Sequence, residues 1–213
     1  MGHRDSAAIE GILIDLDETL YSREEGFWAW VETEARHAGA LERLDRHRIA
    51  ELDRRGRGDK EALLEYLGIV FDWNEDPRGR LRRFRAGLTA AIRLAPGMRE
   101  SLGRLGERYR LGLVTNGTAE TQRAKLLALG VADLFNPVVI SEEAGFRKPD
   151  IRIFEFAIAG WALPPESVLF VGDDPISDIE GAEAAGMHAL QVGCESGLSS
   201  ILNLESWLQE LNA

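Results

Sequence analysis

Five aspartates stand in two short acidic segments, each of which closes an apolar run. One segment reads Asp-Leu-Asp-Glu-Thr-Leu and the other Val-Gly-Asp-Asp-Pro-Ile-Ser-Asp; the five are Asp15, Asp17, Asp173, Asp174 and Asp178. Carboxylates disfavour one another's charge, so they cannot all stay ionised close together unless a cation compensates them. Oxygen ligands without histidine or cysteine suit a hard cation, for which Mg²⁺ is the natural candidate. The two segments therefore predict a magnesium site, provided that the fold brings them together.

Two further segments supply groups that suit an anion. Thr115, Asn116 and Gly117 follow a third apolar run, and Lys148 stands in Phe-Arg-Lys-Pro-Asp. The chain has only three lysines against 22 arginines, which makes each lysine of interest. A cation, a lysine and the amides and hydroxyl of a turn would together hold an anion. A phosphoryl group uses such a site best, because its transfer depends on positioning and charge neutralisation.

Alternating strands and helices are predicted around these segments. The candidate strands are 9–16, 109–115, 137–140, 167–171 and 187–192, and the candidate helices are 118–129, 150–161, 176–185 and 200–211. Such alternation predicts an α/β, Rossmann-like fold, with a parallel sheet of about five strands and helices on both faces. Ligands of open parallel sheets bind outside the carboxyl ends of the strands. The four polar segments all follow strands, so we expect them to meet at that edge.

The stretch 21–94 has a different character, because it shows no convincing strand. Apolar residues at helical spacing predict four helices there; the second runs through residues 41–52, and Asp59 is a suitable N-cap for the third. We therefore predict a core of residues 1–20 and 95–213 and an inserted helical cap of residues 21–94. The exit Ala95-Pro96-Gly97 is suited to a hinge, since proline ends a helix and glycine frees the backbone.

Composition excludes several classes of protein. The net charge is −11, and residues 21–95 carry 15 basic against 14 acidic residues, so the excess acid lies in the remainder. An acidic core argues against a nucleic-acid partner. No apolar stretch reaches the roughly 20 residues that cross a bilayer, and residues 1–8 do not resemble a signal peptide. Cys194 is the only cysteine, so no disulfide forms within the chain. We expect a cytoplasmic protein, and the sequence does not indicate its oligomeric state.

The four segments, in their order, resemble the four motifs of the haloacid dehalogenase superfamily. The resemblance extends from about Ile9 to Val192, and the helical insert falls where that family carries a small helical cap. It implies that Asp15 attacks phosphorus and forms an aspartyl-phosphate, while Asp17 protonates the leaving group and then activates water. Thr115 and Lys148 would hold the phosphoryl oxygens.

The resemblance also implies a ligand set for Mg²⁺: Asp15, Asp173 and the backbone carbonyl of Asp17. Of the two remaining aspartates, Asp174 and Asp178, one would reach the metal through water and the other would orient Lys148, and either could instead serve its helix start. The remaining motif residues, expected to contact the phosphate or to support residues that do, are Asn116 and Gly117.

The implied activity is that of a phosphatase for a small phosphorylated metabolite, similar to phosphoglycolate, a nucleotide or a sugar phosphate. Dehalogenases of the superfamily lack an acid at the position of Asp17, which argues against that chemistry. A phosphomutase would keep every motif, and a catalytically silent binding protein would keep the fold, so both remain alternatives. In this family the cap chooses the substrate; Tyr21 and Arg23 are candidates for that contact.

Overall fold

The computed structural model describes residues 8–193 and 197–211, so Cys194 and residues 1–7 lie outside the described parts. Five parallel strands form one sheet in the order β3-β2-β1-β4-β5. Their bounds are β1 (Gly11–Ile14), β2 (Arg110–Thr115), β3 (Val138–Ile140), β4 (Val168–Gly172) and β5 (His188–Gln191). The predicted α/β fold is thus confirmed, with every predicted strand present.

Strand β1 lies at the centre of the sheet and is buried along its whole length. Ile14 is in register with Leu113 of β2 and Val171 of β4. The amide of Asp15 donates to the carbonyl of Val171 at 2.9 Å, so the ladder continues one residue past the strand. Asp15 is thereby fixed at the carboxyl edge, between the ends of two neighbouring strands.

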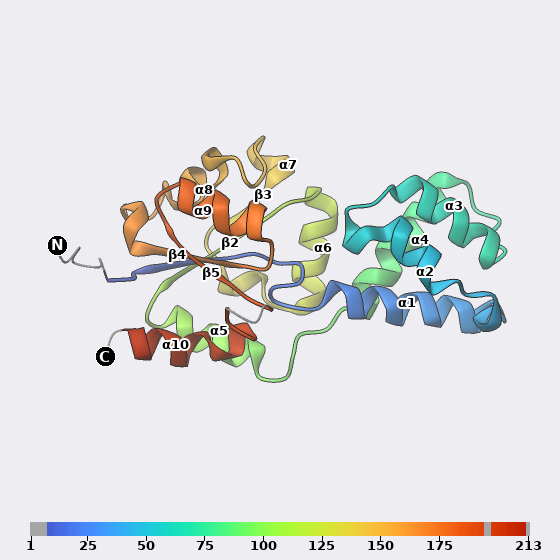
Figure 1. Cartoon of the computed structure of the whole chain (residues 1–213), viewed down its shortest axis with the longest axis horizontal. Helices are drawn as coiled ribbons and strands as arrows, with labels where there is room; N and C mark the ends of the chain where they lie inside the picture. Colours follow the sequence, from blue (N-terminus) through green and yellow to red (C-terminus); the bar gives the residue numbers. More distant parts are fainter. Residues whose placement is uncertain (1–7, 194–196, 212–213) are drawn as a thin grey trace. The chain divides into compact units, whose positions relative to one another are not determined.

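Helices cover both faces of the sheet (Figure 1): α5 and α10 lie on one side, and α8 and α9 on the other. On α8, Ile153, Phe154 and Ala157 are buried, and the Phe154 ring meets Phe170 of β4 edge-on at 5.1 Å. The bounds of the core helices are α5 (Met98–Gly106), α6 (Ala119–Leu129), α7 (Ser141–Ala144), α8 (Ile151–Ile158), α9 (Gly181–Ala184) and α10 (Leu204–Leu211). The short 3₁₀ turns are η3 (Ala132–Leu134), η4 (Pro165–Ser167) and η6 (Ile201–Asn203).

Three details differ from the sequence predictions. Helices α5 and α7 were not predicted, and the predicted helix 176–185 is a π-helical turn, η5 (Pro175–Glu180), followed by α9. In the insert, the predicted helix through residues 41–52 is divided. The carboxylate of Asp45 accepts the amide of Arg48 and caps a new helix, so the chain cannot continue the preceding turn.

Residues Ser22–Arg93 form a second compact unit, and the remainder of the chain forms the first. The elements of the second unit are α1 (Arg23–His37), η1 (Leu41–Arg43), α2 (Arg46–Asp53), η2 (Arg54–Gly56), α3 (Lys60–Val70) and α4 (Pro77–Ala91). Its core contains Phe27, Trp30 and Phe84, whose rings pack against one another. Asp59 caps α3 as expected, accepting two amides. Within the described residues of both units, no helix has the length and apolarity that crossing a bilayer requires.

Candidate active site

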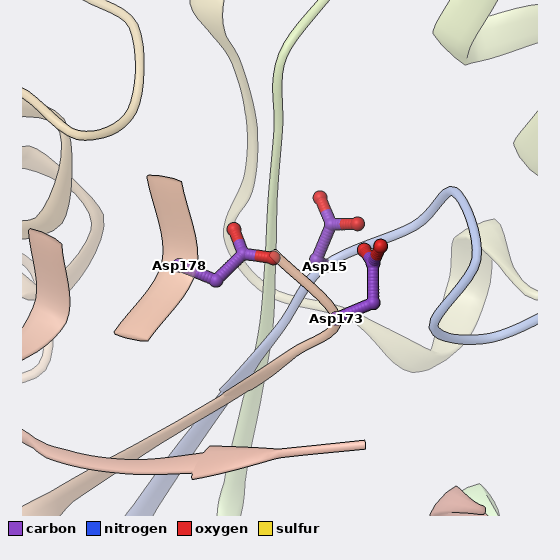
Figure 2. Close-up of side chains that lie close together, drawn as sticks. All are labelled: Asp15, Asp173 and Asp178. Atoms are coloured by element: carbon purple, nitrogen blue, oxygen red, sulfur yellow. The ribbon is translucent and has the colours of Figure 1, made fainter. Parts of the chain in front are cut away.

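Three carboxyl groups lie together at the carboxyl edge of the sheet (Figure 2): Asp15 follows β1, Asp173 follows β4, and Asp178 belongs to η5. One oxygen from each lies within 4.8 Å of the others. Gly172, the last residue of β4, makes this approach possible. A Cβ atom there would lie 2.3 Å from Oδ2 of Asp178, so any side chain would displace that carboxylate.

Lys148 lies against this cluster and is 3% exposed. Its Nζ atom is 2.5 Å from Oδ1 of Asp15 and 2.7 Å from Oδ1 of Asp178. Burial disfavours the ammonium form, but the two carboxylates outweigh it and raise the pKa of Lys148. The lysine is therefore a permanent positive charge. Asn116 fixes its backbone, because the Asn116 amide donates to the Lys148 carbonyl and accepts from the Lys148 N–H, each at 3.0 Å.

The cluster has an excess of negative charge that suits a divalent cation. With all three carboxyl groups ionised, the buried site would carry two negative charges more than its one ammonium offsets, and the donors are all oxygen. Burial raises the pKa of Asp15 to about 8; Lys148 opposes this shift and Asp178 reinforces it. The hydroxyl of Thr19 lies 3.5 Å from carboxylate oxygens of both Asp15 and Asp173. The residues present therefore fit Mg²⁺.

Asp17 lies beside the cluster but has its own partners. Nζ of Lys125 is 2.6 and 2.8 Å from the two oxygens of its carboxylate. The amide of Gln122 donates to Oδ2 at 2.8 Å, and the hydroxyl of Tyr21 donates to Oδ1. Burial opposes ionisation of Asp17, but these donors outweigh it and lower the pKa of its carboxyl below the ordinary 3.8. Two buried lysines thus serve two different aspartates.

The structure places the other predicted residues around this centre. Thr115 ends β2, is 1% exposed, and accepts the amide of Gln122 at 2.6 Å. Asp174 caps η5, accepting the amides of two residues at its start, and its own amide donates to Asp178. Gly117 donates its amide to the hydroxyl of Ser141.

The two candidates for substrate contact differ in their placement. Tyr21 reaches the predicted acid–base residue directly. Arg23, by contrast, is buried in the second unit, where its guanidinium makes a two-pronged ion pair with Asp53 at 2.6 and 2.8 Å. That commitment argues against Arg23 as a substrate ligand.

Sequence reasoning missed Lys125 and Gln122, which come from α6. Their spacing of three places them on one helix face, and both are buried. Polar residues at that spacing normally form a solvated face, so the pattern alone gave no signal. The scarcity of lysine in the chain was the available clue.

Comparison with known proteins agrees with the fold. The profile of the haloacid dehalogenase-like hydrolases matches residues 12–192. A glyceraldehyde 3-phosphate phosphatase of Pyrococcus furiosus is 32% identical over 200 residues, covering 85% of this chain and 80% of that protein. A glyceraldehyde 3-phosphate phosphatase of Methanothermobacter thermautotrophicus is 46% identical over 87 residues, but there the match covers only 41% of this chain and 38% of that protein.

A solved structure extends the likeness to nearly the whole chain. The magnesium-bound crystal structure of YfnB from Bacillus subtilis matches with a TM-score of 0.73 and 19% identity, covering 97% of this chain and 100% of that one. At that identity the likeness concerns the fold. The profile match over residues 12–192 shows that the chain belongs to the haloacid dehalogenase-like hydrolases.

Proposed function

We propose that the protein is a magnesium-dependent phosphatase that hydrolyses a small phosphomonoester through an aspartyl-phosphate on Asp15. The observation that carries the proposal is the separation of two carboxylates with different surroundings. Asp15 lies in a buried cluster with Lys148, and Asp17 is held by a separate lysine. The charge of Mg²⁺ in the cluster would favour the ionised form of Asp15, which attacks, and the charge of the substrate would favour the protonated form of Asp17, which transfers protons.

In the first half-reaction, an oxygen of Asp15 attacks phosphorus. The O–P bond to Asp15 forms as the ester P–O bond breaks. The negative charge of the bound phosphoryl group would raise the pKa of Asp17 from its lowered value in the free protein, so that Asp17 enters the step protonated and its proton passes to the leaving oxygen. Lys148 neutralises the charge on the phosphoryl oxygens. Thr115 offers its hydroxyl to them, and the turn that follows β2 offers backbone amides. The leaving alcohol departs neutral, and Asp17 remains as a carboxylate.

In the second half-reaction, a water molecule takes the place of the alcohol. Asp17 removes a proton from it while its oxygen bonds to phosphorus, and the bond between phosphorus and Asp15 breaks. Inorganic phosphate leaves, Asp15 regains its carboxylate, and Asp17 regains its proton. Asp15, Asp173 and the backbone carbonyl of Asp17 would hold Mg²⁺, which would supply positive charge that offsets the cluster and the phosphoryl group.

The first substrate to test is glyceraldehyde 3-phosphate, because the relative whose match covers 85% of this chain is named as a phosphatase of that compound. The test of the chemistry itself needs no natural substrate. p-Nitrophenyl phosphate is incubated with the enzyme in the presence of Mg²⁺ and, separately, of a chelator. We expect phosphate release that requires the metal and is abolished by Asp15→Asn.

Asp133→Asn is the matched control, because Asp133 is an exposed aspartate paired with Arg99. It should leave turnover unchanged. Turnover by Asp15→Asn equal to that of the wild type, or equal turnover with and without the metal, would refute the proposal. Conversion of the ester to an isomeric phosphate without release of inorganic phosphate would instead identify a phosphomutase.

A further inference from the structure

The second buried lysine of the first unit has no role in the mechanism above. Lys125 lies on α6 and is 5% exposed. Its Nζ atom is within 2.8 Å of both oxygens of Asp17, a geometry in which one ammonium spans the whole carboxylate. A buried ammonium is costly unless it is paired, so this contact determines where the lysine side chain lies.

Two further donors complete the surroundings of Asp17. Gln122, one turn earlier on α6, uses its amide nitrogen for both Oδ2 of Asp17 and the hydroxyl of Thr115. Tyr21 donates to Oδ1 from the loop that follows β1. Each carboxylate oxygen therefore has two donors, from three side chains. Such an arrangement leaves the carboxylate little rotational freedom.

Lys125 also gives Asp17 a counter-charge separate from that of the Asp15 cluster. Lys148 is shared between Asp15 and Asp178, and it makes no ion pair with Asp17 among the described contacts. Asp17 must exchange protons with the leaving oxygen and with water from one fixed place, and misplacement of a catalytic group by about 1 Å can cost about 100-fold. An ordinary structural ion pair would need neither two donors per oxygen nor a position beside the nucleophile.

We infer that Lys125 is a positioning residue of the proposed reaction, which holds the Asp17 carboxylate in the orientation from which it transfers protons. The inference rests on the proposed function. It assigns to α6 a supporting part in the chemistry, since Gln122 of the same helix contacts both Asp17 and Thr115, the proposed phosphate ligand. The role is exercised through Asp17, so it disappears when Asp17 cannot transfer protons.

The experiment is a double-mutant cycle with p-nitrophenyl phosphate and Mg²⁺, using Lys125→Met, Asp17→Asn and the pair. Lys125→Met should lower kcat by about 10- to 100-fold, which does not exceed the lower limit of the roughly 10²–10⁴-fold that an acid–base group supplies, and should change KM by less than about twofold. In the Asp17→Asn background the same substitution should change kcat by less than about twofold. Arg123→Met removes an exposed charge from the same helix and should have no effect.

A purely structural role would give a different pattern. It would lower the fraction of active protein, so Lys125→Met would reduce kcat by the same factor in both backgrounds, and that result would overturn the inference. An unchanged kcat in Lys125→Met would overturn it as well. If circular dichroism shows that Lys125→Met is unfolded, Lys125→Gln replaces it in the cycle. Absence of metal-dependent turnover in the wild type would overturn the proposed function and this inference together, whereas either of the first two results would overturn the inference alone.

Discussion

Asp15→Asn should stabilise the metal-free protein although it abolishes activity. At an effective dielectric constant of about 20, the 2.5 Å contact with Lys148 attracts Asp15 by about 7 kcal/mol. Each neighbouring carboxylate, at no more than 4.8 Å, repels it by at least about 3 kcal/mol. The two repulsions nearly cancel the attraction, which leaves the cost of burying the charge without compensation.

The size of the effect follows from the pKa. The pKa of Asp15 is about 8 in the folded protein against an ordinary 3.8. Each pKa unit is worth about 1.4 kcal/mol, so near pH 7 the folded state loses about 4 kcal/mol by carrying this group. Asparagine carries no charge and can still accept the Lys148 hydrogen bond. We expect the variant to gain about 2–4 kcal/mol, which for a chain of this size raises Tm on the order of 5–10 °C.

The sign of the pH dependence gives an internal check. A carboxyl with a raised pKa destabilises the fold above its unfolded value, and the cost grows until the pH reaches the folded value. In chelator, the gain in stability of Asp15→Asn over the wild type should therefore be small near pH 4, increase toward about pH 8 and stay constant above it. Added Mg²⁺ should decrease this stability difference, because a ligand at about 100 times its Kd stabilises the wild type by about 2.7 kcal/mol.

Thermal unfolding followed by circular dichroism, in chelator and at several pH values, measures the difference. Asp133→Asn, an exposed aspartate, is the control for removal of a carboxylate and should shift Tm little. A variant that melts at or below the wild type near pH 8 in chelator would show that Lys148 compensates Asp15 fully, and would refute the reasoning.

Two other substitutions test one structural feature in each unit: the close approach at Gly172 in the first and the buried ion pair of Asp53 in the second. Gly172→Ala should lower kcat by about 100-fold, because its methyl group would lie 2.3 Å from Asp178. The control is Gly103→Ala, where a methyl group would meet open space. Equal kcat values for the two variants would contradict the steric argument. Asp53→Asn should destabilise the second unit by about 3–5 kcal/mol in urea unfolding, because it leaves the buried guanidinium of Arg23 without its anion. A loss under about 1 kcal/mol would show that solvent compensates the Arg23 guanidinium without Asp53.

Sequence reasoning could predict the position of a residue where its neighbours in the chain determine the local structure; the chemistry assigned to these residues stays a prediction. Asp15 ends a buried apolar strand, and Lys148 precedes a proline, so each was placed by its neighbours in the chain. The role of Asn116 was less accessible, because it depends on a backbone 32 residues away. Lys125 was not found for the same reason: its partner Asp17 is 108 residues distant, and nothing in α6 itself shows that this helix face points at a carboxylate.

The predicted boundaries of helices and strands were wrong where a side chain competes with the backbone for hydrogen bonds. Helix α2 begins late because Asp45 caps it, and η5 is wound differently from a regular helix after the cap at Asp174. Strand β1 is shorter than predicted, although its hydrogen bonding continues to Asp15. Helix α5 was overlooked despite buried residues at helical spacing, Met98, Leu102 and Leu105, because two glycines interrupt its sequence.

The central position of β1 has a consequence for how the chain is assembled during synthesis. The strand that carries the nucleophile is made first, but its two neighbours, β2 and β4, follow only after the whole inserted unit. Until then an apolar strand has both edges unpaired, a condition that slows folding and invites aggregation. The insert makes the pairing of β1 with β2 easier, because its two ends lie close together: Gly26 of α1 packs directly against Ile92, just beyond α4. Once these helices have packed, the long connection between β1 and β2 closes as a short loop, and the entropy cost of pairing the two strands falls.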